Sequence, residues 1–159
     1  LALQAMSVRC RAPIPGKAVI GFEVAYAHRR PVLLADIVEQ GLKKELTLPL
    51  ALGVDIVGRP LVVDLRSVPH LLVAGATGSG KSVALSSMLV SLLLSRTPEE
   101  LKLILIDPKR LEFSLYAEIP HLLFPHITEP GEAVSALAWL VDEMERRYEK
   151  LAAAGARSV

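Results

Sequence analysis

A glycine-rich segment near the middle of the chain has the residue types and the spacing of a phosphate-binding loop. It reads Gly75-Ala76-Thr77-Gly78-Ser79-Gly80-Lys81-Ser82 and fills every fixed position of the pattern G-x-x-x-x-G-K-[ST]. Glycine adopts positive φ without steric cost, so backbone N–H groups in such a loop can approach a phosphate chain closely. We therefore predict that residues 75–82 bind a nucleotide.

The last two residues of this segment carry the charge and the metal ligand that the loop needs. Lys81 is predicted to reach the β- and γ-phosphates, and the Ser82 hydroxyl is predicted to ligate Mg²⁺. A helix that begins near Gly80 adds its unpaired N–H groups and the positive end of its dipole. A plain glycine-rich turn is the alternative, but such turns rarely place Lys-Ser at a helix start after an apolar strand.

Regular elements on both sides of the loop are expected to position it. The second half of the chain is predicted to contain strand 70–74, helix 81–95, strand 102–106, a short helix over 111–118, a strand over 122–127 and a long helix capped by Thr128. The first three form a strand–helix–strand unit, which predicts a parallel sheet. The predicted fold class is therefore α/β.

The long C-terminal helix has an amphipathic pattern. Its buried stripe is predicted to consist of Val134, Leu137, Ala138, Val141, Met144, Tyr148 and Leu151. Asp142–Arg146 and Glu143–Arg147 have the i,i+4 spacing of ion pairs on the solvated face. Trp139 falls off the stripe, so we expect it to pack against another domain.

The first half of the chain has the pattern of strands and hairpins. Alternating apolar residues predict strands over 6–12, 18–26, 46–54 and 61–65, the first two paired as a hairpin and the last two joined by a turn at 58–60. A short helix is predicted to run from Asp36 to Gly41. The change from hairpins to a strand–helix–strand unit predicts a domain boundary within 48–66, which we place after residue 58.

Composition limits the class of protein. The 159 residues are 52% hydrophobic with a net charge of +1, so the chain can bury a core and charge does not argue for or against a polyanionic partner. The single Cys10 excludes an internal disulfide and fits a reducing compartment. No apolar run reaches the roughly 20 residues of a membrane helix. The chain has no signal-peptide pattern and does not begin with Met, which predicts that it is part of a longer protein.

Several segments together resemble the motor core of FtsK/SpoIIIE-type DNA translocases. They are Pro69-His70-Leu71-Leu72-Val73-Ala74-Gly75, Ile106-Asp107-Pro108-Lys109 with Glu112, Ile119-Pro120-His121-Leu122, Glu143-Met144-Glu145-Arg146-Arg147-Tyr148, Ile14-Pro15-Gly16-Lys17 and Leu52-Gly53-Val54-Asp55-Ile56-Val57-Gly58. The resemblance covers nearly the whole chain from about Val8. A phosphate loop is shared by many families, whereas this ordered set of motifs is far more specific.

The resemblance implies a fold and a function. It implies a small N-terminal α+β domain over 1–58, followed over 59–159 by the first half of a RecA-like P-loop domain with a parallel sheet. It implies that Gly75 to Ser82 bind ATP with Mg²⁺, that Lys81 is catalytic, and that the complete protein forms a hexameric ring that moves double-stranded DNA in chromosome segregation and cell division. It also implies a cytoplasmic motor domain in a protein anchored to the bacterial inner membrane, with no membrane contact from this segment.

The resemblance also implies that part of the machinery lies beyond Val159. The Walker B acids, the DNA-facing loops and the interfacial arginine are expected there, and phosphoryl transfer depends on such positioning groups. Residues 1–159 alone are therefore expected to be poorly soluble, to bind nucleotide poorly and to hydrolyse it negligibly.

Asp107 follows an apolar run and so resembles the metal-side acid of a Walker B motif. In RecA-like motors that acid comes from a later strand, whereas a kinase-like topology would allow it here, so both interpretations remain open. The favoured interpretation is a strand-terminal Asp that bonds the loop backbone. Lys109 and Arg110 are predicted to be solvated, with a contact to a neighbouring subunit's nucleotide as the alternative.

Other charged residues give weaker signals. Three histidines lack the spacing of metal ligands: His70, His121 and His126. The basic residues of the first half are predicted to form a solvated strand face rather than a DNA contact: Arg9, Arg11, His28, Arg29 and Arg30.

A phosphate loop also occurs in proteins with three other functions. A ring ATPase of a secretion system would keep the phosphate loop and move polypeptide instead of DNA. A nucleotide-gated assembly module would bind nucleotide without turnover, and acids on the next strand of the gene would disfavour it. A GTPase is disfavoured because the chain has no Asn-Lys-x-Asp segment.

Overall fold

The computed structural model describes residues 8–16, 18–24, 31–42 and 45–156. Contacts divide the chain into two units, Leu1–Leu33 and Leu34–Val159, each considered by itself. Parts of the predicted strands 6–12 and 18–26, together with Lys17 and residues 28–30, lie outside the described residues.

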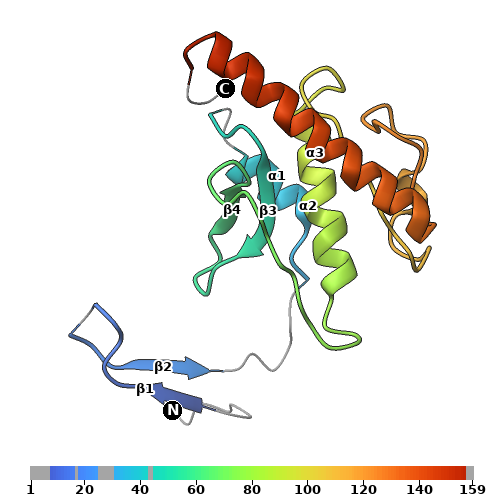
Figure 1. Ribbon diagram of the computed structural model, residues 1–159. Coiled ribbons are helices and arrows are strands. Elements are labelled where there is room, and N and C mark those ends of the chain that lie inside the picture. The colour runs from blue at the N-terminus through green and yellow to red at the C-terminus, as the bar shows by residue number, and fades with distance from the viewer. Residues whose placement is uncertain (1–7, 17, 25–30, 43–44, 157–159) are drawn as a thin grey trace. The chain divides into compact units, whose positions relative to one another are not determined.

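The first unit is a two-stranded antiparallel hairpin (Figure 1). Strand β1 (Val8–Arg11) pairs with β2 (Gly21–Val24) in a register that places Val8 opposite Val24. Arg11 and Glu23 form an exposed ion pair at 3.0 Å across the hairpin. The predicted hairpin is confirmed, and its arginine lies on a solvated surface.

The second unit is built around another hairpin, formed by β3 (Pro49–Val54) and β4 (Pro60–Asp64). The Asp55 carboxylate closes the turn, because its Oδ1 accepts the N–H groups of Val57 and Arg59, both at 2.9 Å. Gly58 supplies the positive φ of 84° that the turn requires. This turn confirms the break predicted at 58–60.

Two helices pack on this hairpin (Figure 1). Helix α1 (Leu34–Gly41) contacts both strands, and α2 (Lys81–Ser95) contacts β3. The bounds of α2 are those predicted. The core between α2 and β3 consists of Leu50, Leu92 and Leu101, with Leu48, Leu65, Met88 and Leu103 packed against it.

One serine of α2 ties the helix to the sheet. Ser91 is fully buried, and its hydroxyl oxygen accepts the N–H of Ala51 at 3.0 Å. The same oxygen lies 3.0 Å from the carbonyl of Pro49 and 2.7 Å from that of Met88. The helix that begins at the phosphate loop is thus fixed to β3 by a polar contact inside the core.

The predicted parallel sheet is present only as short bridges. Leu103 pairs with Leu122, and Ile106 with Ile127, both in parallel orientation, which is consistent with a parallel sheet. Residues 70–74 form no strand, and Leu72 is 91% exposed. The strand prediction at 70–74 is wrong for this structure, because no strand or bridge among the described residues pairs with this segment. Residues 111–118 contain only the short 3-10 helix η1 (Ser114–Tyr116).

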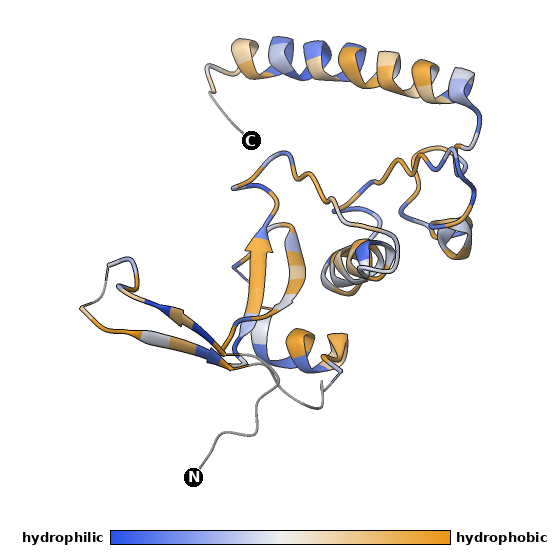
Figure 2. Cartoon of the chain, turned by 90° about the horizontal axis from the view of Figure 1, so that it is seen from below, coloured by the Kyte–Doolittle hydropathy of each residue, from blue (hydrophilic) through white to orange (hydrophobic). Residues whose placement is uncertain are grey.

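Helix α3 (Pro130–Ala153) is the long helix that the sequence predicts, but two details differ. Its N-cap is Glu129, without a side-chain hydrogen bond, and not Thr128. Most of the predicted stripe is exposed, and Ala136 is the buried residue of the helix among those described. Apolar and polar bands alternate along the helix in Figure 2. The predicted burial of the stripe is therefore wrong for most of its residues, because no other helix or strand in the described part of the chain packs extensively against α3.

The contacts of the aromatic and charged residues of α3 differ in part from those that the sequence predicts. Trp139 packs edge to face on Phe124 within the same unit, with ring centroids 5.2 Å apart, so the expected contact with another domain is not what the structure shows. The predicted pair of Glu143 with Arg147 is confirmed at 2.7 Å, whereas Arg146 pairs with Glu143 at 2.6 Å instead of with the predicted Asp142. These pairs lower the pKa of Glu143 to about 2, the bond from Arg146 being the largest cause.

The predicted division after residue 58 falls inside the β3–β4 hairpin, whereas the compact units divide between Leu33 and Leu34. A separate domain over 1–58 therefore stays a prediction. None of the helices in the described part of the chain is long and apolar enough to cross a membrane.

Candidate phosphate-binding site

The glycine-rich loop has the backbone geometry that the motif predicts. Gly78 and Gly80 have positive φ, at 78° and 92°, and the N–H of Ser79 donates to the carbonyl of Ala76 at 3.0 Å. A Cβ on Gly75 would lie 2.3 Å from the Ser79 hydroxyl oxygen, so a side chain at 75 would displace Ser79. The loop is a tight turn that depends on its glycines.

The loop leads directly into the first turn of α2. Gly80 is the N-cap residue in the left-handed conformation, and its carbonyl accepts the N–H of Ala84 at 2.9 Å. The first N–H groups of a helix have no intrahelical partner and, with the helix dipole, favour an anion. Lys81 and Ser82 therefore begin the helix at the end that attracts phosphate.

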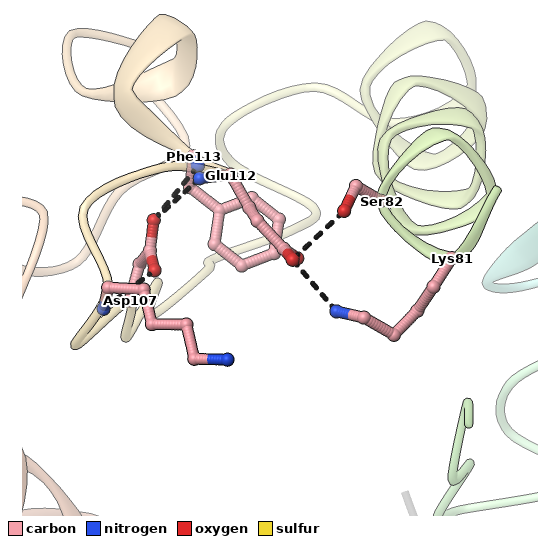
Figure 3. Close-up of polar contacts among 6 residues, drawn as sticks. Lys81, Ser82, Asp107, Glu112 and Phe113 are labelled. Atoms are coloured by element: carbon pink, nitrogen blue, oxygen red, sulfur yellow. Dashed lines mark hydrogen bonds and ion pairs between the residues drawn. The ribbon is translucent and has the colours of Figure 1, made fainter. Parts of the chain in front are cut away.

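The side chains of Lys81 and Ser82 converge on a single carboxylate oxygen (Figure 3). Lys81 Nζ lies 2.8 Å from Oε1 of Glu112, and the Ser82 hydroxyl donates to the same Oε1 at 2.9 Å. Hydrogen bonding to Lys81, and next to Ser82, holds the pKa of Glu112 below its usual value. The two donors thus enclose an anionic oxygen, which is the chemical species that a phosphate would present.

Asp107 holds the segment that carries Glu112 (Figure 3). Its Oδ2 accepts the N–H groups of Glu112 and Phe113, at 2.8 and 3.2 Å, and its Oδ1 accepts that of Lys109 at 3.2 Å. These hydrogen bonds hold the pKa of Asp107 below its usual value, and the bond from the Glu112 N–H is the largest cause. The interpretation of Asp107 as an acid that bonds the loop backbone is confirmed, and its exclusion as the metal-side acid stays a prediction.

Glu112 is the site residue that sequence reasoning missed. In the sequence it appears only in the motif Ile106-Asp107-Pro108-Lys109 with Glu112, and its contacts with Lys81 and Ser82 join residues 31 and 30 positions apart. Only the turn that Asp107 organises brings it to the loop. Arg110, predicted to be solvated, is largely exposed and forms an ion pair with Glu129.

The chemistry of the donors fits a magnesium nucleotide. Among the described residues no three His, Cys, Asp or Glu side chains form a group that could hold a metal ion. Mg²⁺ is often held by few protein ligands, completed by phosphate oxygens and water. A hydroxyl such as that of Ser82 beside a phosphate-binding lysine fits this mode of binding.

Comparison with known proteins identifies the family. The model of the FtsK/SpoIIIE family matches residues 37–159. The chain belongs to the FtsK/SpoIIIE family. The match includes the phosphate loop, Asp107 and Glu112, and it confirms the resemblance drawn from the motifs.

Similar proteins share this stretch of sequence with about half of their residues identical. The DNA translocase FtsK of Campylobacter jejuni is 52% identical over 100% of this chain and 17% of its own length. Those of Haemophilus influenzae and Pseudomonas aeruginosa are each 50% identical over 99% of this chain, which corresponds to 30% and 20% of their lengths. The chain therefore spans less than a third of these relatives.

Proposed function

We propose that this chain is part of an ATP-driven motor that moves double-stranded DNA in chromosome segregation and cell division. The observation that carries the proposal is the convergence of Lys81 Nζ and the Ser82 hydroxyl on one anionic oxygen at 2.8 and 2.9 Å. Family membership and relatives named DNA translocase FtsK support the identity of the cargo.

In this proposal residues 75–82 hold the phosphates of ATP. Backbone N–H groups of the loop and of the first turn of α2 bind phosphate oxygens, because the glycines let the backbone approach. Lys81 places its charge on the β- and γ-phosphates, where negative charge develops during transfer. Mg²⁺, when bound, neutralises phosphate charge, and the Ser82 hydroxyl is its protein ligand from this loop.

We also propose the finer architecture of the complete protein. Two parallel bridges and an apolar face of α3 with exposed Val134, Leu137 and Val141 support a RecA-like parallel sheet that further strands complete. A hexameric ring with ATP near subunit interfaces, an α-type domain over 1–58 and an anchor in the bacterial inner membrane complete this proposal. Such an arrangement leaves this segment on the cytoplasmic side.

Replacing Lys81 tests the function. In the complete protein Lys81→Ala should abolish ATP binding or turnover and keep the circular dichroism spectrum, because the side chain is 36% exposed and, within the described part of the chain, its ion pair is with Glu112. Lys150→Ala removes the same charge from the last turn of α3 and should leave both unchanged. DNA affinity of the complete protein should fall steeply with salt. ATP turnover by a folded Lys81→Ala variant at the rate of the unmodified protein would refute the site.

A further inference from the structure

Glu112 accepts hydrogen bonds from the two side chains, Lys81 and Ser82, that the proposed function assigns to ATP and its metal. Its Oε1 accepts both Lys81 Nζ and the Ser82 hydroxyl, and its side chain is 22% exposed. Lys81 is the single cationic side chain in the motif, so a bound carboxylate already neutralises the charge that the loop offers. A triphosphate brings more negative charge to the same place, and like charges at this distance repel.

The position of Glu112 is fixed by its backbone. Its N–H donates to Asp107 Oδ2 at 2.8 Å, and the N–H of Asp107 donates to the carbonyl of Ile127 at 2.9 Å. Asp107 is itself 5% exposed, so this support is part of the folded interior. Because the Glu112 backbone is held in place, its carboxylate can return to Lys81 and Ser82 whenever they become free. It does so with the high effective concentration of an intramolecular ligand.

We propose that Glu112 is an internal competitor of the nucleotide: its carboxylate binds Lys81 and Ser82 and is displaced when phosphates enter the loop. This inference rests on the proposed function, since it concerns the affinity of the same site. Only the fraction of molecules with Glu112 turned away can bind phosphate, so competition weakens the apparent affinity by that fraction. For a partly exposed ion pair the expected weakening is about two- to sixfold.

Calorimetric titration of the complete protein with inorganic pyrophosphate in EDTA, and with ATP and Mg²⁺, tests the competition. Glu112→Gln removes the charge and keeps the shape, and should bind metal-free pyrophosphate about two- to sixfold more tightly. Glu112→Asp keeps the charge but shortens the side chain, and should shift affinity in the same direction. The gain should shrink as salt screens the pair. Glu129→Gln is the control, since it makes the same charge change at a different ion pair, the one with Arg110.

The outcomes separate the competitor from its alternatives. Unchanged or weaker pyrophosphate binding by both Glu112 variants, relative to Glu129→Gln, overturns the proposal. Weaker binding that occurs only with ATP and Mg²⁺ makes Glu112 a partner of the metal instead, and also overturns it. If the unmodified protein binds neither probe, or Lys81→Ala binds both equally well, the nucleotide site itself is refuted. Circular dichroism of each variant identifies any loss of fold.

Discussion

The buried hydroxyl of Ser91 should contribute measurably to the stability of the unit that carries the phosphate loop. Ser91→Ala removes the acceptor of the Ala51 N–H, which lies 3.0 Å away in the buried core. An unpaired buried N–H costs about 1–3 kcal/mol. Alanine is the better helix former by up to about 0.5 kcal/mol, which offsets part of this loss. We therefore expect the free energy of unfolding to fall by about 1–2 kcal/mol.

Urea denaturation followed by circular dichroism measures this change, and hydrogen exchange locates it. The Ala51 amide should exchange faster in Ser91→Ala, while amides of β1 and β2 should not. Ser95→Ala is the matched control on the same helix, because the Ser95 hydroxyl donates to the Ser91 carbonyl within that helix, at 2.6 Å. Such a bond within one helix contributes little or is slightly destabilising. Equal stability and equal Ala51 exchange in the two variants would refute a stabilising contact between α2 and β3.

Two further predictions concern the loop and its support. Gly78→Ala should weaken pyrophosphate binding about 5- to 30-fold, because a left-handed conformation such as its φ of 78° costs other residues about 1–2 kcal/mol. Gly131→Ala is the control, because a Cβ at that position meets nothing within 4 Å. Equal pyrophosphate binding by the two variants in a titration would contradict the predicted role of Gly78. Asp107→Asn should lower the melting temperature. Because the pKa of Asp107 in the folded state lies below 3.8, the stability that its carboxylate contributes should be complete above pH 3.8 and should be lost as the pH falls through the folded-state pKa. A melt series from pH 7 to pH 2 in which both proteins respond identically would count against that role.

Features set by neighbouring residues could be predicted from the sequence. The bounds of α2 follow from the glycine before Lys81 and the apolar run after it. The turn at Gly58 follows from a residue that tolerates positive φ beside an Asp that bonds the backbone. In both the helix and the turn, the residues that determine the local structure are neighbours in the sequence.

Features set by distant partners could not be predicted with the same success. Residues 70–74 are apolar enough for a buried strand, yet Leu72 is 91% exposed, and no strand that the structure describes pairs beside it. The stripe of α3 has helical spacing, but spacing does not say what covers it, and Val134 is 68% exposed. Glu112 belongs to the same class, because its role depends on a turn that brings it across from another part of the chain.

The C-terminal end and the middle of α2 contact the core of the unit, whereas its N-terminal end contacts Glu112. At the C-terminal end, Arg96 Nε donates to the carbonyl of Thr47 at 2.7 Å, and the Arg96 carbonyl lies 2.9 Å from His121 Nε2. In the middle of the helix, Ser91 bonds β3 inside the core. At the N-terminal end, the Lys81 and Ser82 side chains contact Glu112, and this partly exposed pairing contributes little to stability. The proposed exchange of Glu112 for phosphate should therefore change contacts at the loop without loosening the core that holds the helix.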